Sequence, residues 1–189
     1  MKRRVILGIS GASGASIGLR IAQILGGMVD VELHLVLTSA SRRTIAHEAG
    51  PQALGRLIDI ADHFHSDGDI GATIASGSFR TAGMIVAPCS MRSLAAIASG
   101  FTDNLLTRAA DVQLKERRRL VLLARETPLH LGHLRNMVSV TEMGAIVMPP
   151  VAAFYRNPMS VDELVSDIAA RAVDLLGLCD TPLIAEWQG

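Results

Sequence analysis

The chain has 189 residues, of which 49% are hydrophobic and only 3% aromatic, and its 18 basic side chains balance 18 acidic ones. This length fits a single domain spanning residues 1–189, with enough aliphatic material for a buried core. The balanced charge gives no argument for a nucleic-acid or membrane partner, and no apolar run approaches the roughly 20 residues of a membrane span. Two widely spaced cysteines, Cys89 and Cys179, favour a reducing compartment, so we expect a cytoplasmic protein.

Short aliphatic runs alternate with longer helical stretches along the whole chain. The basic start is followed by a short run that ends in a Gly/Ser-rich turn, which predicts a first strand instead of a signal peptide. Segment 54–77 lacks a clear period and is expected to wrap the surface. The alternation predicts right-handed βαβ crossovers and a doubly wound parallel sheet, in an α/β, flavodoxin-like or Rossmann-like three-layer sandwich. In chain order we predict strand 5–9, helix 15–25, strand 31–37, helix 40–49, strand 84–87, helix 91–99, helix 105–116, strand 120–123, helix 131–143, strand 145–148 and helix 161–176.

The first predicted strand ends in a turn of small residues from Ser10 to Gly18. Small residues allow the backbone to approach a phosphate, and the helix that follows offers free N–H groups and a positive dipole end. The turn lacks the GxGxxG fingerprint, and no acidic residue closes the second strand as a ribose clamp would. A mononucleotide therefore fits better than NAD, although a capped turn without a ligand is the alternative interpretation.

Hydroxyl residues follow two further strands, at Thr38 and in the run Ser90-Met91-Arg92-Ser93. Each set alone is compatible with simple helix capping. Three strand ends of this kind at one edge of a parallel sheet instead favour a polar ligand pocket. We interpret Cys89 as a small buried residue, because no base is tied to it by sequence.

Basic residues are prominent in the second half of the chain. Arg108 and Lys115 are seven residues apart on a predicted helix and therefore share a face, with Asp111 between them. Two cations on one face are able to bind a phosphate, whereas a solvated helix end is the alternative. Arg125 and Glu126 follow the strand 120–123, where a charged pair is costly unless it faces a site.

Two histidine pairs have spacings compatible with a metal site, His63-x-His65 and His130-x-x-His133. Neither pair has a nearby cysteine or a consistent carboxylate partner in the sequence. We therefore interpret them as surface or helix-packing residues and expect no metal.

Several of these segments together resemble the UbiX/Pad family of flavin prenyltransferases, and the resemblance extends over nearly the whole chain. The motifs that carry it are Gly11-Ala12-Ser13-Gly14, Ala87-Pro88-Cys89-Ser90-Met91, Arg108-Ala109-Ala110-Asp111-Val112, Arg125-Glu126-Thr127-Pro128 and Met148-Pro149-Pro150 followed by Ala153-Phe154-Tyr155. The resemblance implies a flavodoxin-like homo-oligomer, typically a dodecamer. It also implies transfer of a dimethylallyl group from dimethylallyl phosphate to reduced FMN, giving prenylated FMN for a partner decarboxylase of the UbiD type.

The resemblance also implies roles for individual residues, carried over by motif. FMN contacts fall on Gly11, Ala12, Ser13, Thr38, Ser90, Met91, Arg92, Ser93 and Arg125; dimethylallyl phosphate contacts fall on Arg108, Lys115, Tyr155 and Arg171; and catalytic roles fall on Glu48, Lys115, Glu126 and Trp187. Thr38 stands where many members have serine, so the hydroxyl is kept. Arg171 stands where relatives have lysine, so the positive charge is kept. Clustered cations would neutralise the departing phosphate, which makes a magnesium cluster unnecessary.

Two other functions share this fold and this cofactor. A flavin-dependent cysteine decarboxylase would carry a Pro-x-Met-Asn motif, whereas Asn104 here lies in Thr102-Asp103-Asn104-Leu105. The other alternative is a non-catalytic FMN-binding subunit of an aromatic-acid decarboxylase complex. The sequence leaves open whether the prenyl donor is a monophosphate or a diphosphate.

Overall fold

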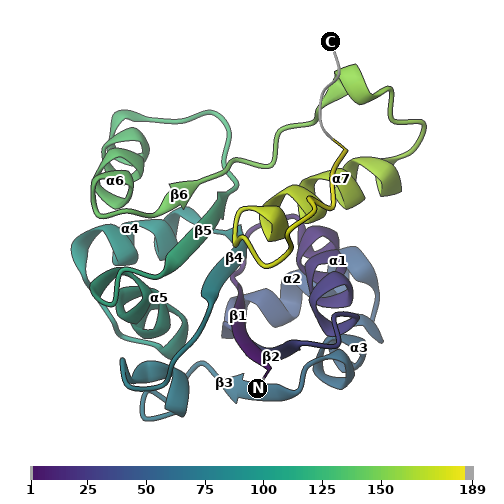
Figure 1. Ribbon diagram of the computed structural model, residues 1–189. Coiled ribbons are helices and arrows are strands. Elements are labelled where there is room, and N and C mark those ends of the chain that lie inside the picture. The colour runs from purple at the N-terminus through teal and green to yellow at the C-terminus, as the bar shows by residue number, and fades with distance from the viewer. Residues whose placement is uncertain (1, 186–189) are drawn as a thin grey trace.

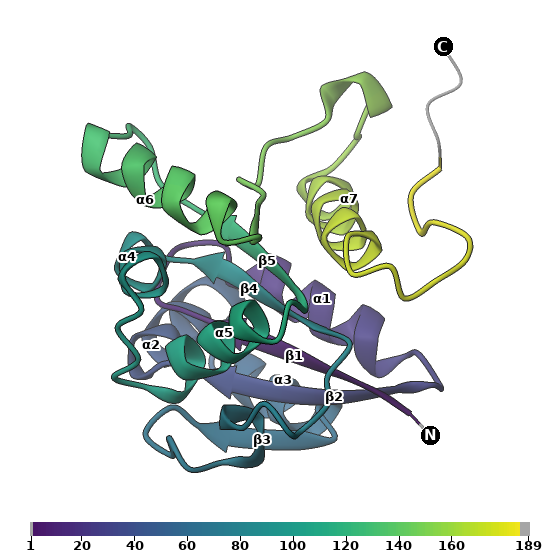
Figure 2. The same ribbon diagram turned by 60° about the vertical axis from the view of Figure 1, so that its left-hand side comes forward.

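The computed structural model describes residues 2–185, which form one six-stranded, all-parallel sheet flanked by helices (Figures 1 and 2). The strand order is β3-β2-β1-β4-β5-β6, which is the doubly wound order with its switch point between β1 and β4. The predicted α/β sandwich is therefore confirmed. The strands are β1 Arg3–Ile9, β2 Val31–Leu37, β3 His63–Ser66, β4 Gly83–Cys89, β5 Arg119–Ala124 and β6 Ile146–Val147. The helices are α1 Ala15–Gly26, α2 Ser39–Ala49, α3 Ala53–Ile60, α4 Met91–Ser99, α5 Leu105–Lys115, α6 Leu131–Glu142 and α7 Val161–Asp174, with short 3₁₀ turns η1 Thr73–Ala75 and η2 Phe154–Arg156.

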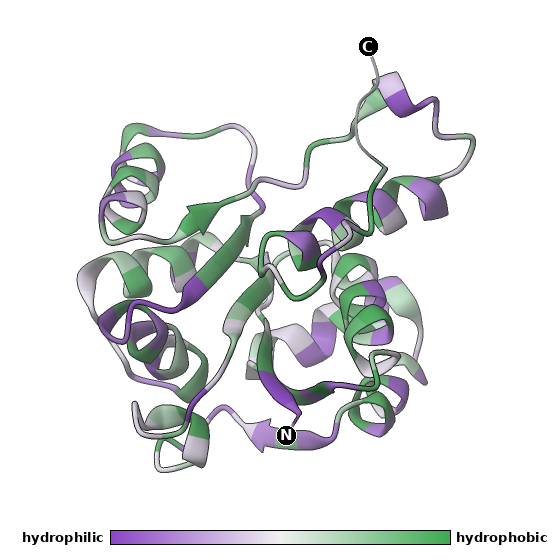
Figure 3. Ribbon diagram, viewed as in Figure 1, coloured by the Kyte–Doolittle hydropathy of each residue, from purple (hydrophilic) through white to green (hydrophobic). Residues whose placement is uncertain are grey.

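Alternate residues of each central strand face opposite layers. Val5 and Leu7 of β1 pack with α1, α2, α3 and α7, whereas Ile6 packs with α4, α5 and α6. Both layers are aliphatic because a parallel sheet is covered on both faces. Figure 3 shows the hydrophobic colour running along the central strands and along the helix faces turned toward them.

The expectation for segment 54–77 was wrong in part, because it contains α3 and the edge strand β3. The strand consists of His63-Phe64-His65-Ser66, none of which is fully buried. An edge strand needs no continuous aliphatic run, since one of its sides has no neighbouring strand. Its pairing with β2 is a tertiary contact, which the local sequence pattern does not reveal.

The segment between β6 and α7 projects away from the sheet, as both views show (Figures 1 and 2). It carries large exposed apolar side chains, with Val151 75%, Phe154 74% and Met159 87% exposed. Exposed apolar side chains that lie close together are typical of protein–protein contacts. They agree with the expected assembly of several copies of the chain.

Among residues 2–185, no helix combines the length and the apolar character that crossing a bilayer requires.

Candidate functional site

A cavity of about 580 Å³ opens at the carboxyl edge of the sheet. It lies at the switch point of the strand order, where doubly wound sheets bind their ligands. Its lining comes from the residues directly after β1, β2, β3 and β4 and from the start of α5. These residues are Ser10, Gly11, Thr38, Ser39, Ala40, Asp67, Ser90, Arg92, Ser93, Asp103 and Asn104.

Three helices begin at this cavity, and each has a side-chain cap. Thr38 accepts a hydrogen bond from Ser41 N at the start of α2, and Ser90 accepts one from Ser93 N at the start of α4. Asn104 caps α5 in the same way, with 3.0 Å between its Oδ1 and Thr107 N. The positive ends of three helix dipoles therefore converge on one volume, which is an environment for an anion.

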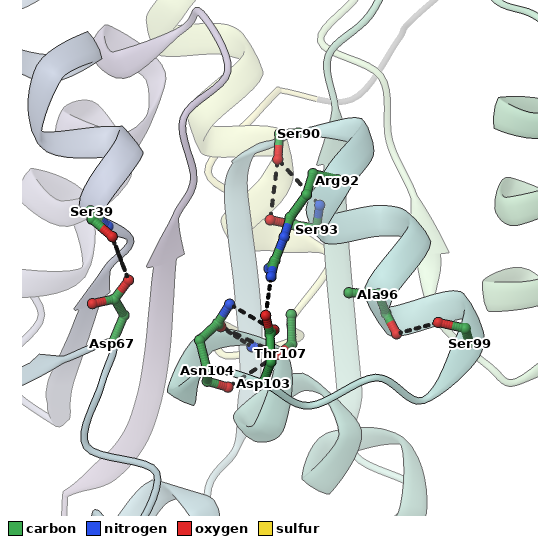
Figure 4. Close-up of polar contacts among 10 residues, drawn as sticks. All are labelled: Ser39, Asp67, Ser90, Arg92, Ser93, Ala96, Ser99, Asp103, Asn104 and Thr107. Carbon is green, nitrogen blue, oxygen red and sulfur yellow. Dashed lines mark hydrogen bonds and ion pairs between the residues drawn. The ribbon is translucent and has the colours of Figure 1, made fainter.

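Charged side chains line the same cavity (Figure 4). Arg92, in the first turn of α4, forms an ion pair with Asp103. Asp67 accepts a hydrogen bond of 3.0 Å from the backbone N–H of Ser39, at the start of α2. Each carboxylate thus occupies a donor that faces the cavity, and an incoming anion would compete with Asp67 and Asp103 for these donors.

Ser10 joins the ends of β1 and β4. Its hydroxyl donates to Pro88 O and accepts from Ser90 N, at 2.7 Å each. Sequence reasoning did not select Ser10, nor did it select Ser39, Asp67, Asp103 and Asn104 as site residues. Asp67 was missed because it follows the unrecognised strand β3, whereas Ser10 and Ser39 adjoin predicted residues and were detectable as strand-end hydroxyls.

Gly11 allows the turn after β1 to lie against α2. A Cβ atom at Gly11 would lie 2.6 Å from the Cβ of Ala40, so a larger residue does not fit. Ala12 is buried in the same turn, and Gly14 has the left-handed φ of 113° that favours glycine. The turn therefore has the small residues for a structural reason as well as for ligand approach.

The N-terminus of α1 is already occupied by a side chain of the protein. Glu48 Oε2 accepts hydrogen bonds from Gly14 N and Ala15 N, both at 2.8 Å. The expectation that a phosphate binds this helix end stays a prediction, and such a phosphate would compete with the Glu48 carboxylate for these two N–H groups. The starts of α2, α4 and α5 line the first cavity and form a second candidate site for an anion.

Glu48 lies close to two other predicted site residues, Ser13 and Arg125. Burial alone would raise the pKa of its carboxyl, but hydrogen bonds from Ser13, Ala15 and Gly14 and the charge of Arg125 together lower it. Glu48 is therefore an anion at neutral pH. The sequence motif around Glu48 is weak, and the tertiary structure supplies its partners.

Arg125 begins the loop after β5. Its backbone N–H donates to Cys89 O at 3.1 Å, which fixes the residue beside the end of β4. Its Nε is buried without a hydrogen-bond partner in the described part of the chain. A buried guanidinium donor without a partner is costly, so Arg125 is suited to a ligand that accepts from it.

A second cavity, of about 420 Å³, lies between α7 and the projecting segment. It brings Tyr155 and Arg171 together, as the resemblance implied. Arg156 also lines it, and its Nε donates to Asp167 at 2.9 Å. Arg171 lines the same cavity, beside the ion pair of Arg156 with Asp167.

Other predicted residues lie away from these cavities in the single chain. Arg108 and Lys115 do share one face of α5, as predicted, but Arg108 donates to Ala75 O at 3.2 Å and to Asp111 at 2.8 Å. Lys115 forms an ion pair with Glu116 in the last turn. That turn is at the amino edge of the sheet, because Arg119 at the start of β5 pairs with Gly83 at the start of β4.

The remaining predicted residues fall into three situations. Ser93 is buried in the first turn of α4, and Met91 is half-buried there. Glu126 is exposed, and its carboxylate accepts a hydrogen bond of 3.1 Å from the neighbouring Thr127 N. Trp187 lies outside the described residues.

Known proteins resemble this chain over its whole length. The family model described as Flavoprotein matches residues 1–173. The flavin prenyltransferase UbiX of Neisseria meningitidis is 56% identical over 189 residues, which covers 100% of this chain and 98% of the relative. UbiX of Escherichia coli K12 is 50% identical, with 99% of each chain covered.

Two solved structures share the fold in detail. One is AnUbiX (PadA1) in complex with FMN and dimethylallyl pyrophosphate, with a TM-score of 0.92, 45% identity and 100% of both chains covered. The other is a dodecameric FMN-dependent UbiX-like decarboxylase from Escherichia coli O157:H7, with a TM-score of 0.93, 46% identity, and 98% of this chain and 100% of that one covered.

Proposed function

Because the chain belongs to the UbiX flavin prenyltransferases of the Flavoprotein family, we propose which ligand each of its two cavities binds. The enzyme transfers a dimethylallyl group from dimethylallyl phosphate to reduced FMN and makes prenylated FMN. We assign the phosphate of FMN to the first cavity and the prenyl phosphate to the second.

The observation that carries this assignment is the convergence of α2, α4 and α5 on the first cavity. The positive dipole ends of these helices and the guanidinium of Arg92 match a dianionic phosphate monoester. The lining offers Thr38 and Ser90 as hydroxyl partners. The cavity residues therefore fit a mononucleotide, and we expect FMN to bind through its phosphate there.

The flavin ring would then extend along the carboxyl edge, from the first cavity toward Arg125. Gly11, Ala12 and Ser13 provide close backbone approach on this path, and the buried Nε of Arg125 needs an acceptor. When bound, reduced FMN would supply the electron-rich atoms that attack the electrophilic allylic carbon, with the phosphate as the leaving group. Glu48, held as a carboxylate beside Ser13, is placed to stabilise positive charge or to accept a proton.

The prenyl donor needs cations, because ionisation of an allylic phosphate is promoted when the leaving group is neutralised. Tyr155 and Arg171 supply one hydroxyl and one cation in the second cavity. We propose that Arg108, Lys115 and Glu126 reach the same site from neighbouring subunits, and that Trp187 contributes an aromatic ring. The exposed apolar side chains of the projecting segment, Phe154 among them, support contact with another copy there.

Mixed oligomers test this shared site directly. We expect Arg171→Ala and Lys115→Ala each to reduce prenyl transfer steeply when purified alone, with FMN binding retained. Co-assembly of the two variants at equal amounts should restore activity, because about a quarter of the shared sites then contain both intact residues. Lys2→Ala, an exposed lysine paired with Asp62 far from both cavities, is the matched control.

The outcomes separate two arrangements. Recovery in the mixture supports a site built from two subunits. Loss of activity without recovery places both residues in one subunit's site, and wild-type turnover in Lys115→Ala returns that residue to the surface.

We also propose the assembly and the destination of the product. A dodecamer agrees with the form of the Escherichia coli O157:H7 relative, and light scattering measures it directly. The recipient of prenylated FMN is a decarboxylase of the UbiD type, in the cytoplasm. Reconstitution of an apo decarboxylase by the product, and failure to do so with FMN alone, tests this destination.

A further inference from the structure

Three side chains that are able to bind a metal lie close together on β2 and on the edge strand β3. They are Glu32, His34 and His63. Glu32 Oε1 lies 3.0 Å from His34 Nε2 and 3.3 Å from His63 Nε2. The three potential ligand atoms all lie within 4.8 Å of one another. The sheet register explains the group, because His34 pairs directly with His63 and Glu32 is two residues before His34 on the same face.

We propose that Glu32, His34 and His63 bind a divalent transition metal, with Zn²⁺ as the ion that best fits two imidazoles and one carboxylate. Metal–ligand bonds of about 2.0–2.2 Å place tetrahedral ligand atoms about 3.3–3.5 Å apart, close to the two separations given above. The fourth position opens to solvent at His63, whose side chain is 53% exposed.

The surroundings of His34 are those of a metal ligand. Its ring is only 3% exposed, and its second nitrogen, Nδ1, lies 3.0 Å from His65 Nε2. A hydrogen bond from Nδ1–H to His65 would fix the tautomer that leaves Nε2 free for a metal. The edge of Phe79 packs against the ring, with 5.2 Å between centroids, and limits its rotation.

One cation opposes the metal. Arg4 Nε lies 3.4 Å from Glu32 Oε1, and its guanidinium is stacked 4.3 Å from the centre of the Phe79 ring. A guanidinium at this distance competes for the carboxylate, so we expect Arg4→Gln to strengthen metal binding. The exposed ring of His63 is able to turn toward the ion with little loss of packing.

The site has a structural consequence, because β3 leads directly to Asp67 in the first cavity. Metal binding would link the edge strand to β2 through side chains as well as backbone hydrogen bonds. We therefore expect the metal to raise the melting temperature of the enzyme, and we assign it no part in prenyl transfer.

The experiment uses untagged, chelator-treated enzyme and Co²⁺ as a spectroscopic probe, followed by Zn²⁺ calorimetry. We expect one Co²⁺ per chain with visible bands of a four-coordinate site, displaced by Zn²⁺. Zn²⁺ should raise the melting temperature of the wild type. His63→Asn and Glu32→Gln should each weaken Zn²⁺ binding at least about tenfold and remove the bands.

Control variants decide between this site and other histidines. His130 and His133 also stack, with 3.6 Å between ring centroids, and His47 is a single exposed histidine. His130→Asn and His47→Asn should leave Co²⁺ binding unchanged. Absence of the Co²⁺ bands in the wild type, unchanged Zn²⁺ affinity in His63→Asn, or loss of binding in His130→Asn would overturn the proposal.

Discussion

Glu48, near the end of α2, binds the backbone N–H of Gly14 at the start of α1, with 2.8 Å between oxygen and nitrogen. The same oxygen also accepts from Ala15 N. One carboxylate thus caps a helix that follows the first strand and stands beside Ser13 in the site. The contact gives Glu48 a role in the fold, which substitution can separate from its proposed role in the chemistry.

We expect Glu48→Ala to lower the free energy of unfolding by about 1 kcal/mol, because the α1 N-terminus loses its cap. Glu48→Gln retains an acceptor oxygen but no charge. It should therefore keep most of the stability while losing turnover. Chemical denaturation and prenyl-transfer assays measure the two effects, with the exposed Glu142→Ala as the control. Full activity in Glu48→Gln would exclude a role for the charge.

Arg92 should discriminate FMN from riboflavin, which lacks the phosphate. We expect Arg92→Ala to weaken FMN binding by about ten- to a hundredfold, because a charge-assisted hydrogen bond is worth roughly 1.5–3 kcal/mol. Riboflavin binding should not change. Arg43→Ala, an exposed arginine on α2, is the control. Equal losses for both flavins would place the phosphate elsewhere.

Asp103→Asn tests the same cavity from the opposite side. The side chain of Asp103 forms an ion pair with Arg92 and adds negative charge near the proposed phosphate. Removing this charge frees the guanidinium, so we expect tighter FMN binding. Fluorescence titration measures the affinity. Weaker binding in Asp103→Asn would mean that Asp103 serves mainly to orient Arg92.

The two cysteines should differ in reactivity. Burial raises the pKa of Cys89 to about 12, so its reactive thiolate is scarce at neutral pH. Cys179 is exposed. We expect a thiol reagent to modify one cysteine per native chain and both after denaturation. Rapid modification of two thiols in the folded enzyme would contradict the packing of Cys89.

The histidines of β2 and β3 should make stability depend on pH. Burial lowers the pKa of both His34 and His65, so each binds its proton more readily in the unfolded chain. Unfolding free energy should therefore fall as the pH drops below about 6.5, with a slope of up to about 1.4 kcal/mol per pH unit for each extra proton. Denaturation of metal-free enzyme measures it. The slope should flatten in His65→Gln, and an unchanged slope would exclude that residue.

Local sequence patterns determined most of the fold. The sequence predicted four strands, β1, β2, β4 and β5, and the helices between them to within a few residues. Strands that are buried on both faces need continuous aliphatic runs, and such runs are visible in the sequence. Small and hydroxyl residues after β1, β2 and β4 also indicated the carboxyl edge of the sheet, where the first cavity lies. In the structure, Thr38, Ser90 and Arg92 all line one cavity at this edge.

Only the tertiary structure decided which side chains occupy the helix ends. Nothing local to Gly14 shows that Glu48 fills the start of α1, since the two residues are 34 apart in the chain. The edge strand β3 was missed because a polar, half-exposed strand has no hydrophobic period. Asp67, which follows this strand, and the contact of His63 with His34 were therefore missed as well. Sequence spacing describes neighbours along the chain, whereas sheet register and helix packing determine which distant side chains meet.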